Sequence, residues 1–289
     1  MIPYLSLSYS SHQNADCTTE CINHSFGSEQ ITPDSSYSYS FKLCSWDSCI
    51  REPGGAISST TPGASITITA CTINNCNSTK PNTTPTYSYN GGAIYANGIK
   101  EFAVSSSSFI CCCAPQTTHD NGGAGGIFAY DIKTTVSLSS SHFISCFAGA
   151  AGGGAHFESI KTSSVGPQTV NNCRFVQCVA EGISPDGGGL NLWYATYTPG
   201  CSNCLFSQCE AQWGGGLDFT SNGSPDRHPI RFSFFNNNSV ISGGSGKDIY
   251  FYSPQGTPCL HCFSTTESPR IGGASSQDND WLPLTRLRL

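Results

Sequence analysis

The sequence predicts an all-β protein, a single-stranded right-handed parallel β-helix of about seven coils. Three observations lead to this fold. A glycine phrase and an aromatic-cysteine phrase alternate along the chain at a nearly fixed interval, short segments alternate apolar and polar residues, and no segment shows the pattern of an amphipathic helix. Such a repeat indicates a solenoid, in which each coil packs against its neighbours.

We divide the chain of 289 residues into three parts. Residues 1–30 are expected to form an N-terminal segment or a degenerate cap, residues 31–252 the β-helix, and residues 253–289 a C-terminal cap with an irregular tail. The first residues, MIPYLSLSYSS, do not have the charged head and long apolar middle of a secretory signal. Export would then use another route, or the gene would start upstream of Met1.

The glycine phrase is a pair or triplet of glycines followed by an apolar residue. Runs of glycine mark tight turns, where a positive φ angle or a close backbone approach excludes a side chain. In GGGLDF, Leu217 and Phe219 flank Asp218, an alternation typical of a strand. Each phrase therefore predicts a turn followed by a short strand. Copies begin at Gly54, Gly91, Gly125, Gly152, Gly187 and Gly214, with a degenerate copy at Gly243.

The second phrase is an aromatic residue or Ile followed three residues later by Cys or Asn. It lies 15 to 20 residues after the apolar residue of each glycine phrase, whereas the return to the next glycine phrase takes 11 to 21 residues. Insertions thus fall on the return leg, as expected for loops between coils. The pairs are Trp46 and Cys49, Ile73 and Cys76, Phe109 and Cys112, Phe143 and Cys146, Phe175 and Cys178, Phe206 and Cys209, and Phe235 and Asn238.

Equivalent residues of successive coils are expected to stack in columns, because neighbouring strands lie about 4.8 Å apart. The phenylalanines of the second phrase predict an aromatic column in the interior. The residues three positions later predict a structural ladder of Cys76, Cys112, Cys146, Cys178, Cys209 and Asn238. Further strands are predicted from the alternating residues Ile66, Ile68, Phe102, Val104, Val136, Leu138, Ile230 and Phe232.

Seventeen cysteines are typical of an oxidising compartment or of metal binding. Stacked cysteines would have a Cα separation within the roughly 4.4 to 6.8 Å that a disulfide tolerates. Cys173 with Cys204, and Cys178 with Cys209, occupy equivalent places. Side chains that run parallel would strain the bond and favour free thiols, so the sequence leaves both states open.

We expect no metal and no cofactor. The CxxC of Cys201 and Cys204 is about 55 residues from the CLHC of Cys259, His261 and Cys262, outside the spacing of zinc ribbons. The cysteines of CCC, residues 111–113, alternate faces on a strand and would not bind one ion together.

The net charge argues against a nucleic-acid-binding protein, and the spacing of the carboxylates argues against a glycoside-cleaving enzyme. The net charge is −6 and no basic stripe is present, so nucleic acid is not an expected partner. Asp186, Asp218, Asp226 and Asp248 lie in separate coils at turn or outward positions, without an accompanying His, Arg or Lys phrase. Glycosidic chemistry needs carboxylates that converge on one bond. We therefore expect no catalytic residue.

The two phrases resemble those of the chlamydial polymorphic membrane proteins and their relatives among trichomonad surface proteins, a family marked by repeated GGAI and FxxN. The resemblance covers roughly residues 40–252. GGAI is literal at residues 54–57 and 91–94, and FxxN at residues 235–238; elsewhere Cys replaces the Asn, which makes this chain a cysteine-rich variant. The resemblance implies a secreted or surface-displayed β-helix that acts in adhesion.

The expected function is therefore non-catalytic binding at the cell surface or outside the cell, with a host or cell-surface protein or glycan as partner. The expected binding face is the outward column after the glycines, together with the loops near Lys80 and Ser184. That column consists of Tyr95, Phe128, His156, Asn191, Asp218 and Tyr250. The alternative is a polysaccharide-degrading β-helix enzyme, since this fold also carries lyases and hydrolases.

Overall fold

The computed structural model describes residues 19–28, 30–33, 37–51, 53–78, 91–115, 123–158, 169–182, 185–193, 200–220, 230–252, 260–264, 271–272 and 280–283. Within these ranges every regular element is a β-strand, and the strands pair in parallel. No helix in the described part of the chain has the length and apolar character needed to cross a membrane. The predicted parallel β-helix is confirmed.

Sheet A, the largest sheet, has seventeen strands in two series that meet at a corner. The first series is β1 (Thr19–Ile22), β3 (Ser38–Lys42), β6 (Ser65–Thr69), β9 (Glu101–Ser105), β13 (Thr135–Ser139), β17 (Thr169–Asn171) and β21 (Gly200–Ser202). The second is β2 (Ser25–Gly27), β4 (Ser45–Asp47), β7 (Thr72–Asn74), β10 (Ser108–Ile110), β14 (His142–Ile144), β18 (Arg174–Val176) and β22 (Leu205–Ser207). Strand β25 (Ile230–Asn236) continues both series, and β28 (Leu260–Ser264) and β30 (Asp280–Pro283) follow it.

Two smaller sheets complete each coil. Sheet B consists of β5 (Ile57–Ser59), β8 (Ile94–Asn97), β12 (Ile127–Tyr130), β16 (Ala155–Glu158), β20 (Leu190–Trp193), β24 (Leu217–Thr220), β27 (Ile249–Tyr252) and β29 (Ile271–Gly272). Sheet C consists of β11 (Cys113–Ala114), β15 (Phe147–Ala148), β19 (Val179–Ala180), β23 (Glu210–Trp213) and β26 (Ser239–Ser245).

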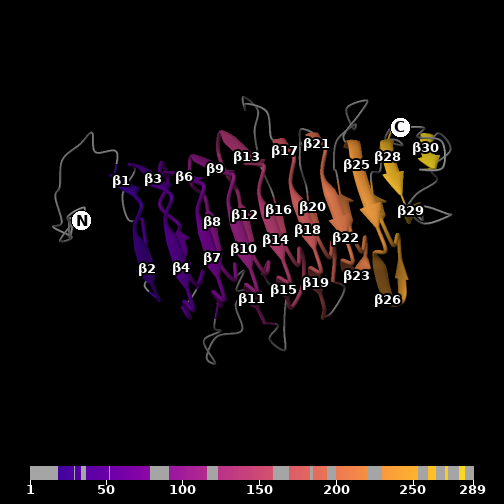
Figure 1. The fold of residues 1–289 in the computed structure, drawn as a ribbon, viewed down its shortest axis with the longest axis horizontal. Helices are drawn as coiled ribbons and strands as arrows, with labels where there is room; N and C mark the ends of the chain where they lie inside the picture. The colour runs from indigo at the N-terminus through magenta and orange to yellow at the C-terminus, as the bar shows by residue number, and fades with distance from the viewer. Residues whose placement is uncertain are drawn as a thin grey trace, which may run out of the picture.

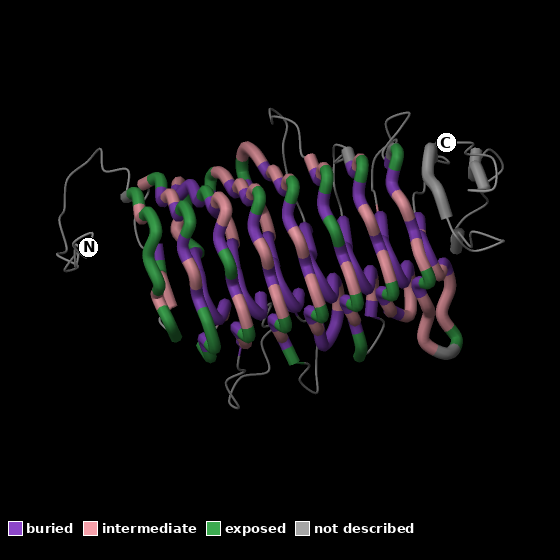
Figure 2. Tube along the Cα trace, viewed as in Figure 1, coloured by how far each residue is buried: buried purple, intermediate pink, exposed green. Residues whose placement is uncertain are grey.

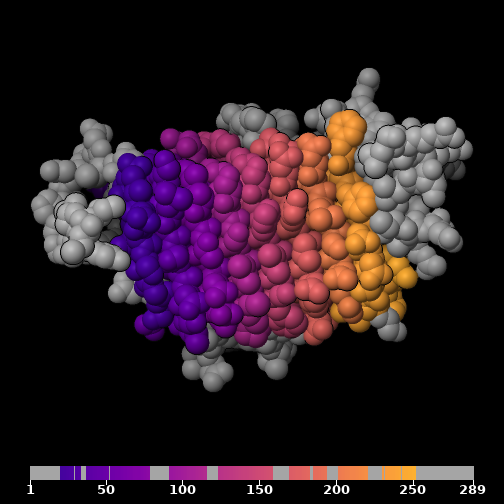
Figure 3. All heavy atoms as spheres, in the orientation of Figure 1, coloured from indigo at the N-terminus to yellow at the C-terminus, as the bar shows by residue number. Residues whose placement is uncertain are grey.

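One coil shows the path of the chain. Strand β12 of sheet B is followed by β13 and β14 of sheet A and by β15 of sheet C, and then β16 returns to sheet B beside β12. Successive coils stack along the long axis in chain order (Figures 1 and 3). Sheet B has eight strands, one per coil, so the number of coils differs slightly from the seven expected.

The parallel pairing also extends beyond the expected limits of residues 31–252. Strands β1 and β2 pair with β3 and β4, and β28 and β29 pair with β25 and β27. The described parts of both terminal segments therefore continue the sheets instead of ending them.

The interior holds the predicted aromatic column. Successive rings of Phe109, Phe143, Phe175, Phe206 and Phe235 have centroids 4.7 to 5.0 Å apart and lie nearly parallel. All five side chains are buried. Figure 2 shows the alternation of buried and more exposed residues along the chain. Offset aromatic pairs of this kind contribute about 0.5–1.5 kcal/mol each beyond their burial.

Two corners in each coil are made by a single residue with a positive φ angle. Asn172 (φ 55°) lies between β17 and β18, and Gln177 (φ 54°) between β18 and β19. Each is followed by a buried cysteine, Cys173 and Cys178. The left-handed conformation turns the chain through a corner within one residue, so the next side chain faces the interior.

The prediction for Phe232 as an inward residue is wrong. Phe232 is 61% exposed and has a φ of 49°, and it therefore occupies the corner position of its coil. The simple alternation from Ile230 stops at this corner, and the next inward residues are Ser233 and Phe235.

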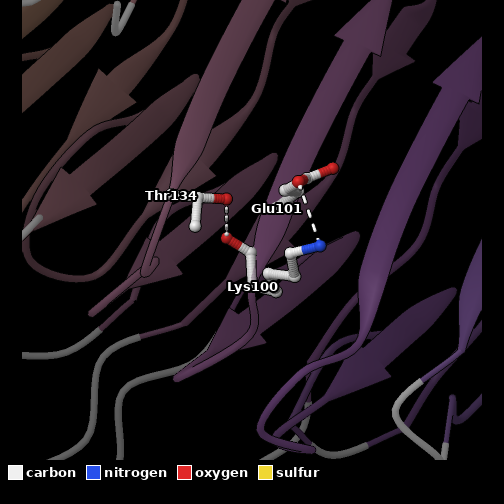
Figure 4. A network of polar contacts seen from close by, with 3 residues as sticks. All are labelled: Lys100, Glu101 and Thr134. Carbon is white, nitrogen blue, oxygen red and sulfur yellow. Dashed lines mark hydrogen bonds and ion pairs between the residues drawn. The ribbon is translucent and has the colours of Figure 1, made fainter. Parts of the chain in front are cut away.

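The passage from sheet B to sheet A is fixed by hydrogen bonds between coils. The hydroxyl of Thr134 donates to the carbonyl oxygen of Lys100 at 2.8 Å, and Nζ of Lys100 lies 3.5 Å from Oε1 of Glu101 (Figure 4). Both Lys100 and Glu101 side chains are about half exposed, so the ion pair contributes little and the bond to the backbone sets the register here.

Candidate functional site

The expected binding column lies on the outer face of sheet B, and its residues are in register. His156 pairs with Phe128 and Asn191, and Asp218 pairs with Asn191 and Tyr250. Tyr95 precedes Phe128 in the same column. The alignment of the six residues is thus as expected.

The exposure of these six side chains differs from the expectation. The exposed fractions are 8% for Tyr95, 1% for Phe128, 3% for His156, 1% for Asn191 and 2% for Asp218, and Tyr250 is of intermediate exposure. The expectation that these side chains form an open surface is therefore wrong. The expected loops near Lys80 and Ser184 lie outside the described residues.

Part of this burial comes from the turn that precedes each strand. Gly152 has a φ of +67°, and a Cβ atom placed there would be 2.9 Å from Cβ of His156. A Cβ atom placed on Gly187 would likewise lie 2.9 Å from Cα of Asn191. The glycine turn thus folds back against the outward residue of the same coil, which the alternation of polarity does not reveal.

Three outward columns result on this face. The turn column, in front of the glycines, contains Ala124, Ala151, Asp186, Trp213 and Ser245. The middle column is the one expected from the sequence. The third column, two residues further along each strand, contains Asn97, Tyr130, Glu158, Trp193 and Thr220.

The residue types on this face change along the axis of the β-helix, from aromatic to polar and back to aromatic. At the N-terminal end Tyr95 and Phe128 stack with centroids 5.8 Å apart, and towards the C-terminal end Trp213 and Tyr250 are in ring contact at 5.2 Å. Between them lies a polar cluster, which we define as His156, Glu158, Asp186, Asn191 and Asp218. These residues come from three successive coils.

One half of the polar cluster is a buried His and Glu pair. Nε2 of His156 lies 3.3 Å from Oε2 of Glu158, without the alignment of a hydrogen bond. The His156 ring also contacts the Phe128 ring at 5.0 Å and the edge of Trp193 at 6.3 Å. Aromatic neighbours therefore hold this imidazole on both sides.

The other half is a pair of interacting carboxyls. Loss of hydration raises the pKa of Asp186 to about 7. Loss of hydration and, second, the charge of Asp186 raise the pKa of Asp218 well above its usual value, against a hydrogen bond of 3.2 Å from the hydroxyl of Thr220. The expectation that Asp218 is a solvated surface residue is wrong.

The expectation for Asp248 is corrected in the same way. Asp248 is 1% exposed, and its Oδ1 accepts a hydrogen bond of 3.0 Å from Nδ2 of Asn238. It is therefore part of the interior at the C-terminal end of the ladder. Asp226 lies outside the described residues.

The structural ladder is confirmed, and its side chains donate hydrogen bonds to backbone carbonyl oxygens. Cys112, Cys146, Cys178 and Cys209 each donate from Sγ to the carbonyl oxygen of the ring or Ile residue one coil earlier, at 3.4 to 3.6 Å. Nδ2 of Asn238 makes the same bond to Phe206 at 3.2 Å. Cys and Asn are thus alternative donors to one recurrent carbonyl.

A second ladder was not predicted. It lies two residues before each ring and contains Cys44, Cys71, Ser107, Ser141, Cys173, Cys204 and Ser233, all buried. The backbone N–H of Cys71 donates to Oγ of Ser107, and that of Ser107 donates to Oγ of Ser141. The recurrence of Cys or Ser before the aromatic residue was the signal for it.

None of the fourteen cysteines in the described residues is part of a disulfide, and this includes Cys173, Cys204, Cys178 and Cys209. Burial raises the pKa of Cys112, Cys146 and Cys178 well above the usual thiol value. These thiols are protonated at neutral pH and therefore poor nucleophiles. In the described ranges no group of three or more His, Cys, Asp or Glu side chains is arranged to hold a metal ion. Cys259 lies outside them.

The outer face of sheet A is the accessible one. Its first series presents small hydroxyl residues in register, Thr67, Thr69, Ser105, Ser137, Ser139 and Thr169. Its second series presents an apolar stripe, which we define as Ile110, Ile144 and Val176 in register. Leu205 and Phe234 are paired in the neighbouring column, which also contains Arg174. All of these side chains are at least partly exposed.

Comparison of the chain with protein-family models, with curated proteins and with solved structures gives no match. The resemblance to the polymorphic membrane proteins therefore stays a prediction.

Proposed function

We propose that the protein is a non-catalytic β-helix of the cell surface or extracellular space, which binds a host or cell-surface protein or glycan in adhesion. In this proposal the outer face of sheet A makes the contact. The observation that carries it is the difference between the two faces: the middle outward column of sheet B is buried except at Tyr250, whereas the hydroxyl rows and the apolar stripe of sheet A are at least partly exposed.

The chemistry of the sheet A face suits a macromolecular partner. The apolar stripe of Ile110, Ile144 and Val176 runs across three coils beside rows of hydroxyl groups. Apolar side chains exposed together, with polar neighbours, are typical of interaction surfaces. Charged residues also lie on this face, among them Glu101 in β9 and Arg174, which pairs with Leu205.

The test uses one substitution at two places. Ile144→Lys puts a charge in the middle of the apolar stripe, and Ile50→Lys puts the same charge outside it, at a residue that bridges to Asn77 and is 55% exposed. We expect Ile144→Lys to reduce binding of the labelled chain to intact cells at least tenfold, because a charged group would have to be desolvated on contact. Ile50→Lys should bind as the unsubstituted chain does.

Equal binding by the two variants would remove the sheet A face from consideration. Circular dichroism of both variants shows whether each is folded. Treatment of the cells with glycosidases or with proteases then separates a glycan partner from a protein partner.

A second candidate is the degradation of polysaccharides. It is favoured by the polar cluster, which brings together carboxyls that the sequence places in separate coils. Three of its four titratable side chains are at most 5% exposed, which gives a substrate little access and makes this the second choice. Incubation with acidic polysaccharides would show new reducing ends or unsaturated products if the chain is an enzyme of this kind.

A further inference from the structure

Unpaired polar atoms gather at one place on sheet B. Seven buried side-chain nitrogen or oxygen atoms in the described residues have no hydrogen-bond partner, and three of them belong to His156, Glu158 and Asn191. Buried polar atoms in folded proteins are almost always paired. Nε2 of His156 and Oε2 of Glu158 lie 3.3 Å from each other, whereas Oδ1 of Asn191 has no such neighbour. This buried amide oxygen indicates a bound partner that supplies the missing interaction.

The position of Asn191 identifies the centre of this place. Asn191 is 1% exposed, its Oδ1 is one of the three unpaired atoms, and it lies between His156 and Asp218 in the middle column. Gly187 folds the chain back so closely that a Cβ there would be 2.9 Å from Cα of Asn191, which brings the preceding Asp186 beside it. Asn191 and Asp218 are thus direct neighbours in register, and the carboxyl of Asp186 interacts electrostatically with that of Asp218.

The charge of the cluster is unbalanced. Glu158, Asp186 and Asp218 are acids, and His156 is the basic side chain that accompanies them in the three outward columns as defined above. His156 lies against Glu158, so it does not neutralise the other pair. Buried carboxylates without a cationic partner are costly, and a bound cation offsets that cost.

We propose that Asp186, Asn191 and Asp218 form a binding site for a hard divalent cation of the calcium class. Their oxygen atoms are carboxylate and amide oxygens, which calcium prefers, and water would complete the coordination. Only two of its ligands are carboxyls, so the site is smaller than a group of three or more His, Cys, Asp or Glu side chains, and no group of that size is found in the described residues. Zinc is disfavoured because no thiol belongs to the cluster.

A route for the ion exists on the side of Asp186. This residue is of intermediate exposure, whereas Asn191 and Asp218 are buried. An ion can therefore reach the carboxyl of Asp186 from solvent and bind Asn191 and Asp218 behind it. This inference is independent of the proposed adhesion, which uses the opposite sheet.

The test uses terbium, which replaces calcium and emits when a nearby tryptophan is excited. Trp213 pairs with Asp186 in the turn column and Trp193 follows Asn191 in β20. We expect saturable terbium emission from the full chain, displaced by calcium, and a rise of several degrees in the unfolding temperature with calcium. Asp218→Asn should weaken the affinity for terbium at least tenfold, and Glu101→Gln, on sheet A, should leave it unchanged.

A second variant separates loss of the site from loss of the fold. Trp213→Phe removes the neighbouring sensitiser but no ligand, so it should lower the terbium emission while the unfolding temperature still rises with calcium. Equal terbium affinity of the Asp218→Asn variant and the full chain would overturn the proposal. So would an unfolding temperature of the full chain that does not respond to calcium.

Discussion

At the scale of single residues, the polar cluster is the feature that sequence patterns conceal most. Asp218 has the alternating position of an outward residue, and outward residues of a sheet are normally hydrated. The glycine turn packs against its column, and the exposed fraction falls to 2%. A residue can therefore point away from the core and still be dehydrated.

The raised pKa of Asp186, about 7, predicts a pH dependence of stability in the chain freed of metal by a chelator. The folded state holds this proton more tightly than the unfolded state, so the contribution is fully present below the unfolded pKa and is lost as pH rises through about 7. The cause of the shift is the loss of hydration of the Asp186 carboxyl on burial.

Asp186→Asn removes this titration. Its free energy of unfolding, relative to that of the unsubstituted chain, should therefore rise between about pH 5 and about pH 8, by at most ~1.4 kcal/mol per pH unit. Urea unfolding at four or five pH values measures the difference. A difference that is constant over this range would show that Asp186 titrates normally.

At the scale of the elements, the glycine phrase and the aromatic phrase belong to one packing unit. A Cβ on Gly189 would lie 2.9 Å from the ring of Phe206 in the same coil, and Gly154 and Gly216 are related in the same way to Phe175 and Phe235. The glycine that ends each triplet thus leaves room for the ring that closes the coil, which explains why the two phrases recur together.

The middle glycine of each triplet is more tightly enclosed by neighbouring atoms than the last one. A Cβ on Gly153 would be 2.2 Å from the carbonyl oxygen of Gly188 and 2.5 Å from the backbone nitrogen of Val179. Both neighbours are backbone atoms and cannot turn away. We expect Gly153→Ala to lower the free energy of unfolding by about 3 kcal/mol or more.

Gly98→Ala is the matched control. Gly98, unlike Gly153, has a positive φ, of +68°, and no atom lies within 4 Å of its added Cβ. The cost should be the backbone strain alone, about 1–2 kcal/mol. Urea unfolding of both variants makes the comparison, and similar losses would mean that contact between coils does not explain the glycine phrase.

Much of the packing between strands could be predicted from the sequence. The aromatic column and the ladder from Cys76 to Asn238 follow from spacing, because equivalent residues of a solenoid must stack. The corner at Phe232 was not predictable from alternation, since one left-handed residue shifts the inward positions after it. The second ladder was missed because Ser and Cys alternate in it without a fixed residue type.

At the scale of the whole molecule, the two outer faces differ in exposure. Spacing predicts which residues share a face, but it does not predict whether the face is open, since exposure depends on what packs against it. Tyr95 and Phe128 illustrate the point: they are aligned as expected, yet only 8% and 1% exposed. Substituting them would test stability and not binding.

The central claim is that the protein binds through the outer face of sheet A, and hydroxyl-radical footprinting tests it most directly. In the free chain, Phe232, which is 61% exposed, should be oxidised much faster than Phe128, which is 1% exposed. On binding to cells, Ile144 and Val176 of the apolar stripe should become protected, while Trp193 of sheet B keeps its rate. Protection of Trp193 with unchanged oxidation of Ile144 and Val176 would contradict the account.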